Sequence, residues 1–286
     1  MICHFSCGST SAVATLLVIE SGLLEEAIYA DPGTEHPSNK LFLDDFEKLT
    51  NHKITILTSS KYKTPLEVFR ARRYLGGVGG APCTTELKKI PIRDYLGNRL
   101  YESDQVFGYT SDESKRIDRF RENNPLVTLK NILVENGLSK NDCQYILDGL
   151  GLELPEMYKL GYSNSNCIGC VKAGLGYWAA IREDFPDVFS EHAILERELG
   201  AKLDNGKPKG AAINKRYING VRHRVFLDEL PLDIKPDRKS SFACGYSCGE
   251  QQEYFDMGED KSCMTPVSSN ARDTLERMKV LFNIAS

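Results

Sequence analysis

The feature that most constrains the fold is a turn of small residues between two apolar runs at the start of the chain. Residues 1–5 form an apolar run of strand length, and residues 12–19 form one that is long enough for a helix. The turn between them reads Ser6-Cys7-Gly8-Ser9-Thr10-Ser11. A helix that begins directly after a strand leaves backbone N–H groups unpaired at the positive end of its dipole. The stretch therefore predicts either an anion-binding turn or a capped turn that holds no ligand.

The side chains of this turn suit the first alternative. Gly8 lets the backbone come close to a phosphate group, because glycine has no side chain to keep a ligand away. Four hydroxyl side chains can donate hydrogen bonds to such a group, namely Ser6, Ser9, Thr10 and Ser11. We therefore treat the turn as a candidate phosphate site.

Strand and helix patterns alternate after the turn. A strand is expected at 27–30, a helix at 38–49, a strand at 53–58, a helix from Pro65 and a strand at 105–109. This alternation predicts an α/β fold with a mostly parallel, Rossmann-like sheet that helices cover on both faces. Ligands of such sheets bind beyond the carboxyl ends of the strands, where the loops that begin at Ser6 and Asp31 would both lie.

The alternation stops near Gly151, which divides the 286 residues into an expected first region, 1–150, and a mainly helical, cysteine-bearing second region, 151–286. Helices are expected in the second region at 177–183, 188–199 and 271–282. A hairpin is expected around Asn219-Gly220, because this pair is typical of a two-residue hairpin turn.

The hairpin region is basic although the whole chain is acidic. The net charge of −4 argues against broad, charge-driven binding to nucleic acid, but a local basic surface is compatible with it. Near the hairpin a single acid, Asp204, accompanies Lys207, Lys209, Lys215, Arg216, Arg222 and Arg224. These cations would either contact the phosphates of a nucleic acid or form a solvated surface.

The cysteine content favours a reducing, cytoplasmic setting. Nine cysteines form no disulfide framework that the spacing would indicate, and the start of the chain has no signal-peptide pattern. No run of about 18 apolar residues predicts a membrane-spanning helix. In such a setting, clustered cysteines are more often metal or redox sites than disulfides.

Two close cysteine pairs predict a metal or cluster site. Cys167 and Cys170 have the spacing of a metal knuckle, and Cys244 with Cys248 would complete a set of four sulfur ligands. Such soft ligands suit either Zn²⁺ or a 4Fe-4S cluster. Alternatively, Cys83 joins Cys167, Cys170 and one of the later pair, and the other late cysteine becomes a nucleophile or a persulfide carrier. A third interpretation is that these are small buried thiols.

Four segments of the first 120 residues resemble, in the same order, motifs of the phosphoadenosine phosphosulfate (PAPS) reductase-like family of the adenine-nucleotide α-hydrolase, or PP-loop, superfamily. Residues 6–11 resemble a degenerate form of the pyrophosphate loop S-G-G-x-x-S, and residues 31–36 resemble the loop that approaches the nucleotide. Residues 83–88 resemble the segment C-x-x-x-L-K, and residues 108–116 resemble the segment G-x-x-x-x-E-S-x-R. Residues 166–178 are similar to the cysteine segment of PAPS reductase-like proteins, and this likeness extends to 244–248.

The resemblance implies a Rossmann-like fold of the HUP type that binds ATP or a related adenylyl nucleotide. The phosphate contacts that it implies come from Ser6, Gly8, Ser9, Thr10 and Ser11, with Asp31 and Glu35 near the nucleotide. Ser9 and Thr10 stand where adenylating relatives carry Lys and Asp, so the phosphate charge would be neutralised by Lys88 and Arg116. Either Glu35 or Asp112 would hold Mg²⁺.

Three functions are compatible with these residues. The first is a sulfur-transfer enzyme that activates a substrate with the nucleotide and thiolates it, with tRNA or DNA as the acceptor and a separate sulfur donor. The second is a reductase of PAPS or adenylyl sulfate that attacks through Cys244 or Cys248 and is regenerated by thioredoxin. The third is a nucleotide-binding module without catalysis, whose cysteines hold structural zinc. The sequence leaves the oligomeric state open.

Overall fold

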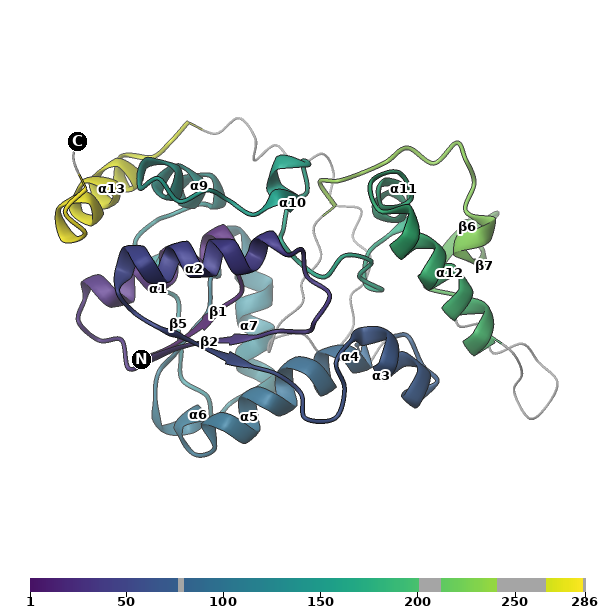
Figure 1. The fold of residues 1–286 in the computed structure, drawn as a ribbon, viewed down its shortest axis with the longest axis horizontal. Helices are drawn as coiled ribbons and strands as arrows, with labels where there is room; N and C mark the ends of the chain where they lie inside the picture. The colour runs from purple at the N-terminus through teal and green to yellow at the C-terminus, as the bar shows by residue number, and fades with distance from the viewer. Residues whose placement is uncertain (77–79, 201–211, 241–265, 285–286) are drawn as a thin grey trace.

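The computed structural model describes residues 1–76, 80–200, 212–240 and 266–284. Its centre is a five-stranded parallel sheet with the strand order β3-β2-β1-β4-β5. Helices flank this sheet, with α1 and α2 above it and α5 and α6 below it (Figure 1). The expected α/β, Rossmann-like fold is confirmed.

The strands are short, and the strand that begins the chain lies in the middle of the sheet. In chain order they are β1 (Ile2–Phe5), β2 (Glu26–Ala30), β3 (Ile54–Leu57), β4 (Gln105–Val106) and β5 (Leu129–Lys130). Phe5 at the end of β1 pairs with Tyr29 of β2, which pairs with Ile56 of β3. The loops that follow these strands therefore open at one common edge, as the alternation predicts.

The strand β4 is shorter than the expected 105–109, and the reason lies at Gly108. A Cβ atom at Gly108 would lie 2.5 Å from the backbone nitrogen of Ser11, so the chain after Val106 passes directly against the first turn of α1. The sequence pattern did not predict β5, because two residues are too few to show alternation.

One face of the sheet is covered by α1 (Ser9–Glu20), α2 (Ser38–Thr50), α9 (Lys140–Gly149) and α13 (Ser269–Leu281). Nearly every residue of α1 up to Val18 is buried, because the helix is enclosed by the sheet on one side and by helices on the other. Phe42 and Phe46 of α2 belong to the same core as Met278 of α13. The terminal helix therefore packs into the core of the first region, although it belongs to the second in sequence.

The opposite face is covered by α5 (Ile90–Leu96), α6 (Arg99–Glu102) and α7 (Ser114–Asn123). A π-helical turn, η1 (Thr85–Lys89), joins α4 (Pro82–Thr84) to α5. In this turn the Ile90 N–H donates to the Thr85 carbonyl, five residues back. Pro91 follows and has no N–H, so it cannot continue the ordinary helical bonding, and the wider turn accommodates it.

Short helices connect these parts. They are α3 (Pro65–Arg72), η2 (Ser111–Glu113), α8 (Ile132–Glu135), α10 (Glu156–Lys159) and η3 (Leu227–Glu229). The expected N-cap of α9 is confirmed, because the Ser139 hydroxyl accepts a hydrogen bond from the Asp142 N–H. Within the described ranges, no helix is both long and apolar enough to cross a membrane.

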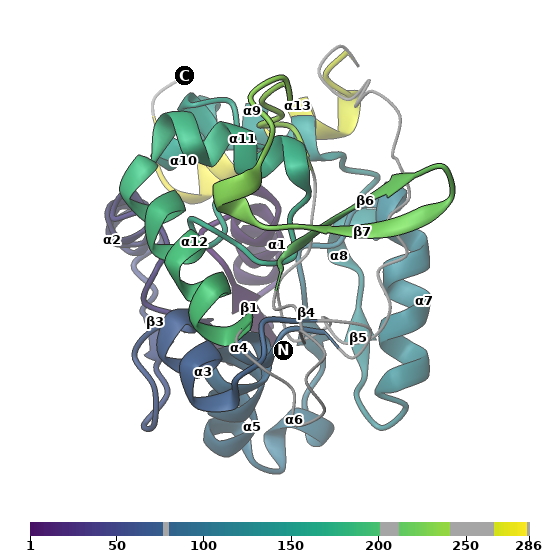
Figure 2. The ribbon, with the colours of Figure 1, turned by 90° about the vertical axis from the view of Figure 1, so that its right-hand side faces the viewer.

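The second region is built on α11 (Leu175–Asp184) and α12 (Pro186–Gly200), which share a core around Trp178. The expected hairpin is confirmed as β6 (Asn214–Ile218) and β7 (Val221–Val225), which projects as a ribbon beside α12 (Figure 2). Asn219 and Gly220 both have positive φ, at 50° and 77°, as this type of turn requires. The Glu196 carboxylate of α12 accepts from the N–H groups of Ile213 and Leu227, one on either side of the hairpin.

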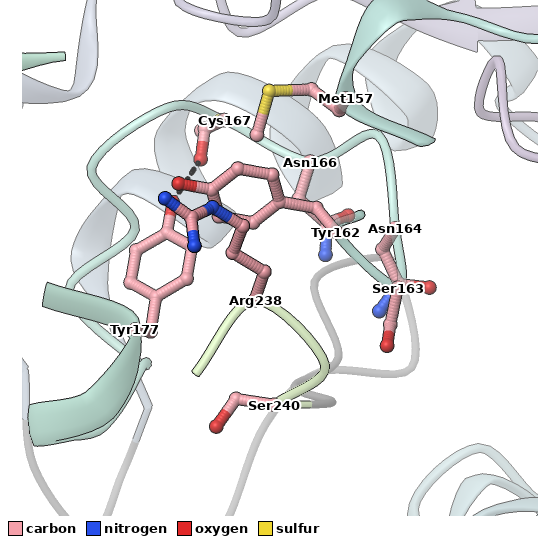
Figure 3. A pocket seen from close by; sticks show the side chains of 9 residues that line it. All are labelled: Met157, Tyr162, Ser163, Asn164, Asn166, Cys167, Tyr177, Arg238 and Ser240. Carbon is pink, nitrogen blue, oxygen red and sulfur yellow. Dashed lines mark hydrogen bonds between the residues drawn. The ribbon is translucent and has the colours of Figure 1, made fainter. Parts of the chain in front are cut away.

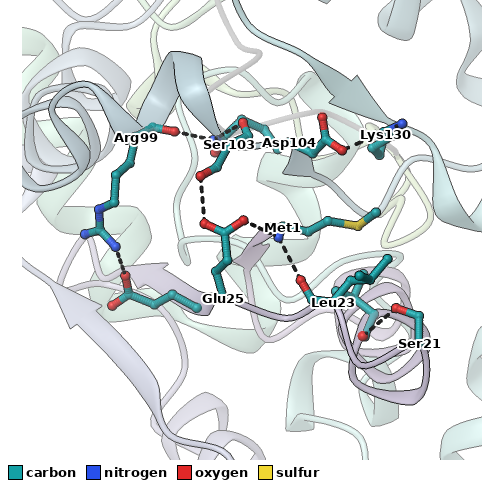
Figure 4. A network of polar contacts seen from close by, with 11 residues as sticks. Met1, Ser21, Leu23, Glu25, Arg99, Ser103, Asp104 and Lys130 are labelled. Carbon is teal, nitrogen blue, oxygen red and sulfur yellow. Dashed lines mark hydrogen bonds and ion pairs between the residues drawn. The ribbon is translucent and has the colours of Figure 1, made fainter.

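The amino ends of the strands are joined by a polar network on the other edge of the sheet (Figure 4). The Met1 amino group donates to the Leu23 carbonyl at 2.7 Å and to the Glu25 carboxylate at 2.6 Å. The same carboxylate accepts from Ser103, which precedes β4, at 2.7 Å. This edge is therefore occupied by contacts within the protein, while the edge at the carboxyl ends carries the candidate site.

Candidate functional site

The site begins at the turn between β1 and α1. Cys7 is fully buried and has a φ of 53°, so the chain reverses tightly before the helix. The Ser11 hydroxyl accepts from the Ser6 N–H at 3.1 Å and from the Ser6 hydroxyl at 3.0 Å, and it donates to the Gly8 carbonyl at 3.0 Å. Ser6 and Ser11, two of the four residues whose hydroxyl groups were predicted to bind phosphate, therefore form hydrogen bonds that stabilise the turn.

The Ser9 hydroxyl has a different environment. Ser9 is fully buried at the first position of α1, and its Oγ atom has no hydrogen-bond partner. A buried hydroxyl without a partner carries a desolvation cost that a bound anion would offset. This orphaned atom fits a phosphate group in the turn.

A tyrosine that the sequence analysis did not single out lies against this turn. The Ser9 N–H donates to the Tyr158 hydroxyl at 3.2 Å, and a Cβ atom at Gly8 would lie 3.4 Å from the same oxygen. Burial raises the pKa of Tyr158, so its hydroxyl keeps its proton. No spacing rule in the sequence connects Tyr158 with Ser9, because 149 residues separate them.

Arg116 lies beside the segment that passes over the turn. Its guanidinium group is 4.7 Å from the centre of the Tyr109 ring and pairs with Glu113. Gly108, directly before this tyrosine, is the residue whose backbone approaches Ser11. The predicted cation is therefore near the turn, although part of its charge is already balanced. Asp112 accepts a hydrogen bond from the Thr110 hydroxyl in the same loop.

The loop after β2 holds the second predicted cation through an ion pair. The Lys88 ammonium group is 3.1 Å from Glu35, and the two side chains are only 9% and 4% exposed. The other carboxylate oxygen of Glu35 accepts from the Tyr29 hydroxyl at 2.6 Å and from the Asn39 amide at 2.8 Å. Each oxygen of Glu35 is thus engaged, which fits an anchor for Lys88 better than a ligand of Mg²⁺.

Asp31 stands at the end of β2 in the same loop. Its carboxylate accepts from the Gly33 N–H at 2.7 Å. Gly33 has a φ of 75°, and a Cβ atom there would lie 2.2 Å from the Lys63 carbonyl oxygen. Among the residues that the structure describes, no three His, Cys, Asp or Glu side chains form a group that could hold a metal.

The Cys7 thiol is close to these charges but is not activated by them. Burial raises the pKa of Cys7 well above its usual value, and the nearby Glu35 raises it further. The opposing effect of Lys88 is smaller. Cys7 therefore stays a neutral thiol within the turn.

The turn from Cys167 to Cys170 is held on α11 and α12. The Tyr177 hydroxyl accepts from the N–H groups of Gly169 at 3.0 Å and Cys170 at 3.4 Å. It donates to the Cys167 carbonyl at 3.2 Å, the bond drawn in Figure 3. In a metal knuckle, the N–H groups of this turn would point at the cysteine sulfur atoms. Here two of them donate to the Tyr177 hydroxyl instead. Gly169 has a φ of 78°, and its Cα faces the ring of His192.

This cysteine turn is hydrogen-bonded directly to the loop after β2. The Ile168 N–H donates to the Thr34 carbonyl at 3.0 Å. The Asn39 amide that holds Glu35 also donates to the Ser165 carbonyl at 3.1 Å. Two regions that lie more than 120 residues apart are therefore joined at one edge of the sheet.

Cys83 lies on the other side of the same cysteine turn. It packs in an apolar cluster that contains Val171, the neighbour of Cys170. The Lys172 ammonium group donates to the Thr84 hydroxyl at 3.0 Å. The segments that carry Cys83 and Cys170 are therefore in contact. Cys244, Cys248 and Cys263, together with Lys207 and Lys209, lie outside the described residues.

A small hollow opens beside Cys167. Its lining includes Met157, Tyr162 and Arg238 (Figure 3). The Arg238 guanidinium group is held 2.7 Å from the Asp184 carboxylate. The cysteine turn thus faces the edge of the sheet on one side and this hollow on the other.

No protein-family model matches the chain, and no curated protein matches it either.

Proposed function

We propose that the protein is a nucleotide-dependent sulfur-chemistry enzyme that binds ATP or a related adenylyl nucleotide at the carboxyl edge of the sheet. The observation that carries this proposal is the bond from the Ile168 N–H to the Thr34 carbonyl. It joins a cysteine pair to the loop that holds Glu35 and Lys88, next to a turn suited to phosphate. A nucleotide and a sulfur atom could therefore meet at one place.

The phosphates would lie at the start of α1. There they would accept hydrogen bonds from the Ser9 hydroxyl and from N–H groups of the first helical turn other than that of Ser9, which donates to Tyr158. Lys88 and Arg116 would supply positive charge, although each already pairs with a carboxylate. A bound phosphate would share the Lys88 ammonium group with Glu35.

The cysteines would supply the sulfur chemistry. Cys167 and Cys170 would hold a 4Fe-4S cluster or zinc together with Cys244 and Cys248. Cys83 is not needed for this set, because among the described residues it forms no three-ligand group with Cys167 and Cys170. Soft thiolate ligands suit both metals. A cysteine or the cluster would deliver sulfur to a substrate that the nucleotide has activated.

The hairpin supports a nucleic acid, tRNA or DNA, as the substrate. Its twelve residues from 214 to 225 contain four Lys and Arg and no acid. The register places Lys215 directly opposite Arg224, so two cations share one stretch of the ribbon. An anionic backbone that lies along the ribbon would pass both of them.

The test uses protein purified without oxygen. Calorimetry measures ATP binding, and pyrophosphate release is measured alone and with tRNA or duplex DNA. We expect ATP to bind, a brown colour if a cluster is present, and pyrophosphate release that the acceptor stimulates. A Lys88→Ala variant should bind ATP about tenfold or more weakly, because a charged contact is lost. A Lys48→Ala variant, changed at an exposed lysine of α2, should bind it normally.

Other results would contradict the proposal in distinct ways. A chain that binds no adenine nucleotide has a different function. Sulfite release from PAPS that is lost in Cys244→Ser or Cys248→Ser would indicate the reductase instead. Nucleotide binding with tightly held zinc but neither reaction would indicate a binding module.

A further inference from the structure

The hydroxyl of Tyr158 lies in the turn where the proposed phosphate would bind. It comes from α10, in the second region, and accepts the Ser9 N–H at 3.2 Å. The same short helix is anchored on the first region, because the Glu156 N–H donates to the Ser38 hydroxyl at 2.9 Å. Contacts with the first residue of α1 and the first residue of α2 therefore hold the tyrosine and its helix in place.

The hydrogen of this hydroxyl is available for a ligand. In its contact with Ser9 the Tyr158 oxygen is the acceptor, so this bond leaves the phenolic hydrogen unused. Burial raises the pKa of Tyr158, which keeps that hydrogen on the oxygen. A protonated phenol beside a helix N-terminus is a good donor to an anionic oxygen.

A second observation points to a ligand at the same place. The Ser9 Oγ atom is buried without a hydrogen-bond partner, and Ser9 itself is 0% exposed. Its backbone nitrogen donates to Tyr158 at 3.2 Å, and its side chain also interacts with the Tyr158 hydroxyl. The two hydroxyl groups therefore lie side by side at the first residue of α1, and the pair keeps one hydrogen for a ligand.

We propose that Tyr158 is a phosphate-binding residue, whose hydroxyl donates to an anionic oxygen of the nucleotide held in the turn. The proposal rests on the proposed function and extends it, because the ligand contact now includes a residue of the second region. The neighbouring Met157 lines the hollow beside Cys167. The helix α10 thus connects the phosphate end of the nucleotide with the cysteine turn.

The experiment compares ATP with adenosine, which has the same base and sugar but no phosphate. Calorimetry gives both dissociation constants for the full chain, for Tyr158→Phe and for Tyr101→Phe, a control on α6. In Tyr158→Phe we expect ATP to bind about 10- to 100-fold more weakly, because one hydrogen bond to a charged group is lost. Adenosine should bind with unchanged affinity. The control should match the unaltered protein with both ligands.

Each other result would overturn the proposal. Unchanged ATP affinity in Tyr158→Phe would mean that the hydroxyl makes no ligand contact, and tighter binding would mean that it competes with the phosphate. Equal losses for ATP and adenosine would indicate a structural role. A Ser9→Ala variant gives a second test, with a loss for ATP alone expected. If the unaltered protein binds no ATP, the proposed function fails as well, and that result is separate from a failure of Tyr158 alone.

Discussion

At the scale of single residues, the site depends on a buried ion pair. Glu35 and Lys88 are almost inaccessible to solvent and face each other at 3.1 Å. Charges at this depth are costly unless they are paired and hydrogen-bonded, and Tyr29 and Asn39 provide additional bonds to Glu35. Lys88 can therefore bind an anionic ligand only while its ammonium group also pairs with the Glu35 carboxylate.

Removing one charge of this pair should destabilise the protein strongly. We expect Lys88→Met to lower the free energy of unfolding by about 3–5 kcal/mol, because it leaves the Glu35 charge buried without its partner. Adding Glu35→Gln should restore much of that loss. Urea denaturation measures all three proteins. Lys48→Met at an exposed site should change stability by less than about 0.5 kcal/mol. A loss from Lys88→Met no larger than this control would contradict the pairing.

A second residue makes stability depend on pH. Burial raises the pKa of Glu196 to about 7 from its ordinary 4.5. The hydrogen bonds that its carboxylate accepts from two backbone N–H groups lower this pKa, but by less than burial raises it. Asp228 raises this pKa further and Arg197 lowers it. Because the folded state binds this proton more tightly than the unfolded chain, the contribution of Glu196 to stability decreases as the pH rises from about 4.5 through 7.

We expect this decrease to disappear in Glu196→Gln, since glutamine does not titrate. Urea denaturation of both proteins at pH 5, 6, 7 and 8 gives the difference in slope. Glu191→Gln, on the same helix but in an exposed position, serves as the control and should keep the slope. Parallel curves for the unaltered protein and Glu196→Gln would contradict the raised pKa.

At the scale of elements, the cysteine turn is fixed between α12 and the loop after β2. Gly169 is its tightest point, because its φ is positive and a Cβ atom there would lie 2.7 Å from His192. The bonds of Ile168 to Thr34 and of Asn39 to Ser165 hold the other side of the turn. The position of the cysteines relative to the nucleotide edge is thus set by packing between helices and loops.

A substitution of Gly169 should show whether α12 packs closely against the cysteine turn. Gly169→Ala should lower the free energy of unfolding by about 2–4 kcal/mol, the sum of a strained backbone and a steric overlap. Gly22→Ala is a matched control, because Gly22 also has a positive φ but nothing lies within 4 Å of its Cβ position. It should cost only about 1 kcal/mol. Equal losses in the two variants, measured by thermal unfolding, would mean that α12 does not confine the turn.

At the scale of the whole molecule, the end of the chain completes the core at its beginning. Ala271, Leu275 and Met278 of α13 are buried in the same cluster as α1 and α9. The Arg277 guanidinium group also lies 2.6 Å from Glu20 at the end of α1. The region 1–150 therefore forms its core together with α13.

The contribution of this terminal helix can be measured with two substitutions. Met278 is 0% exposed, and Met278→Ala should cost about 2–5 kcal/mol, because it leaves a cavity against α1 and α9. Val280 lies two residues later on the same helix and is 79% exposed, so Val280→Ala should be nearly neutral. Similar urea midpoints for the two variants would contradict the packing of α13.

The sequence by itself determined the sheet, the helices around it, the hairpin turn and the edge where the predicted site residues meet. Local periodicity and turn chemistry set these features, since each is decided within a few neighbouring residues. Ser9 was singled out by the chemistry of its turn, and Lys88 by the resemblance of residues 83–88 to a family segment. Only the tertiary structure decided that Lys88 pairs with Glu35, that Ser11 holds the turn and that Tyr158 lies against Ser9. Lys88 and Glu35, like Tyr158 and Ser9, come close only because segments that are distant in sequence pack together, so no local sequence pattern could predict these contacts.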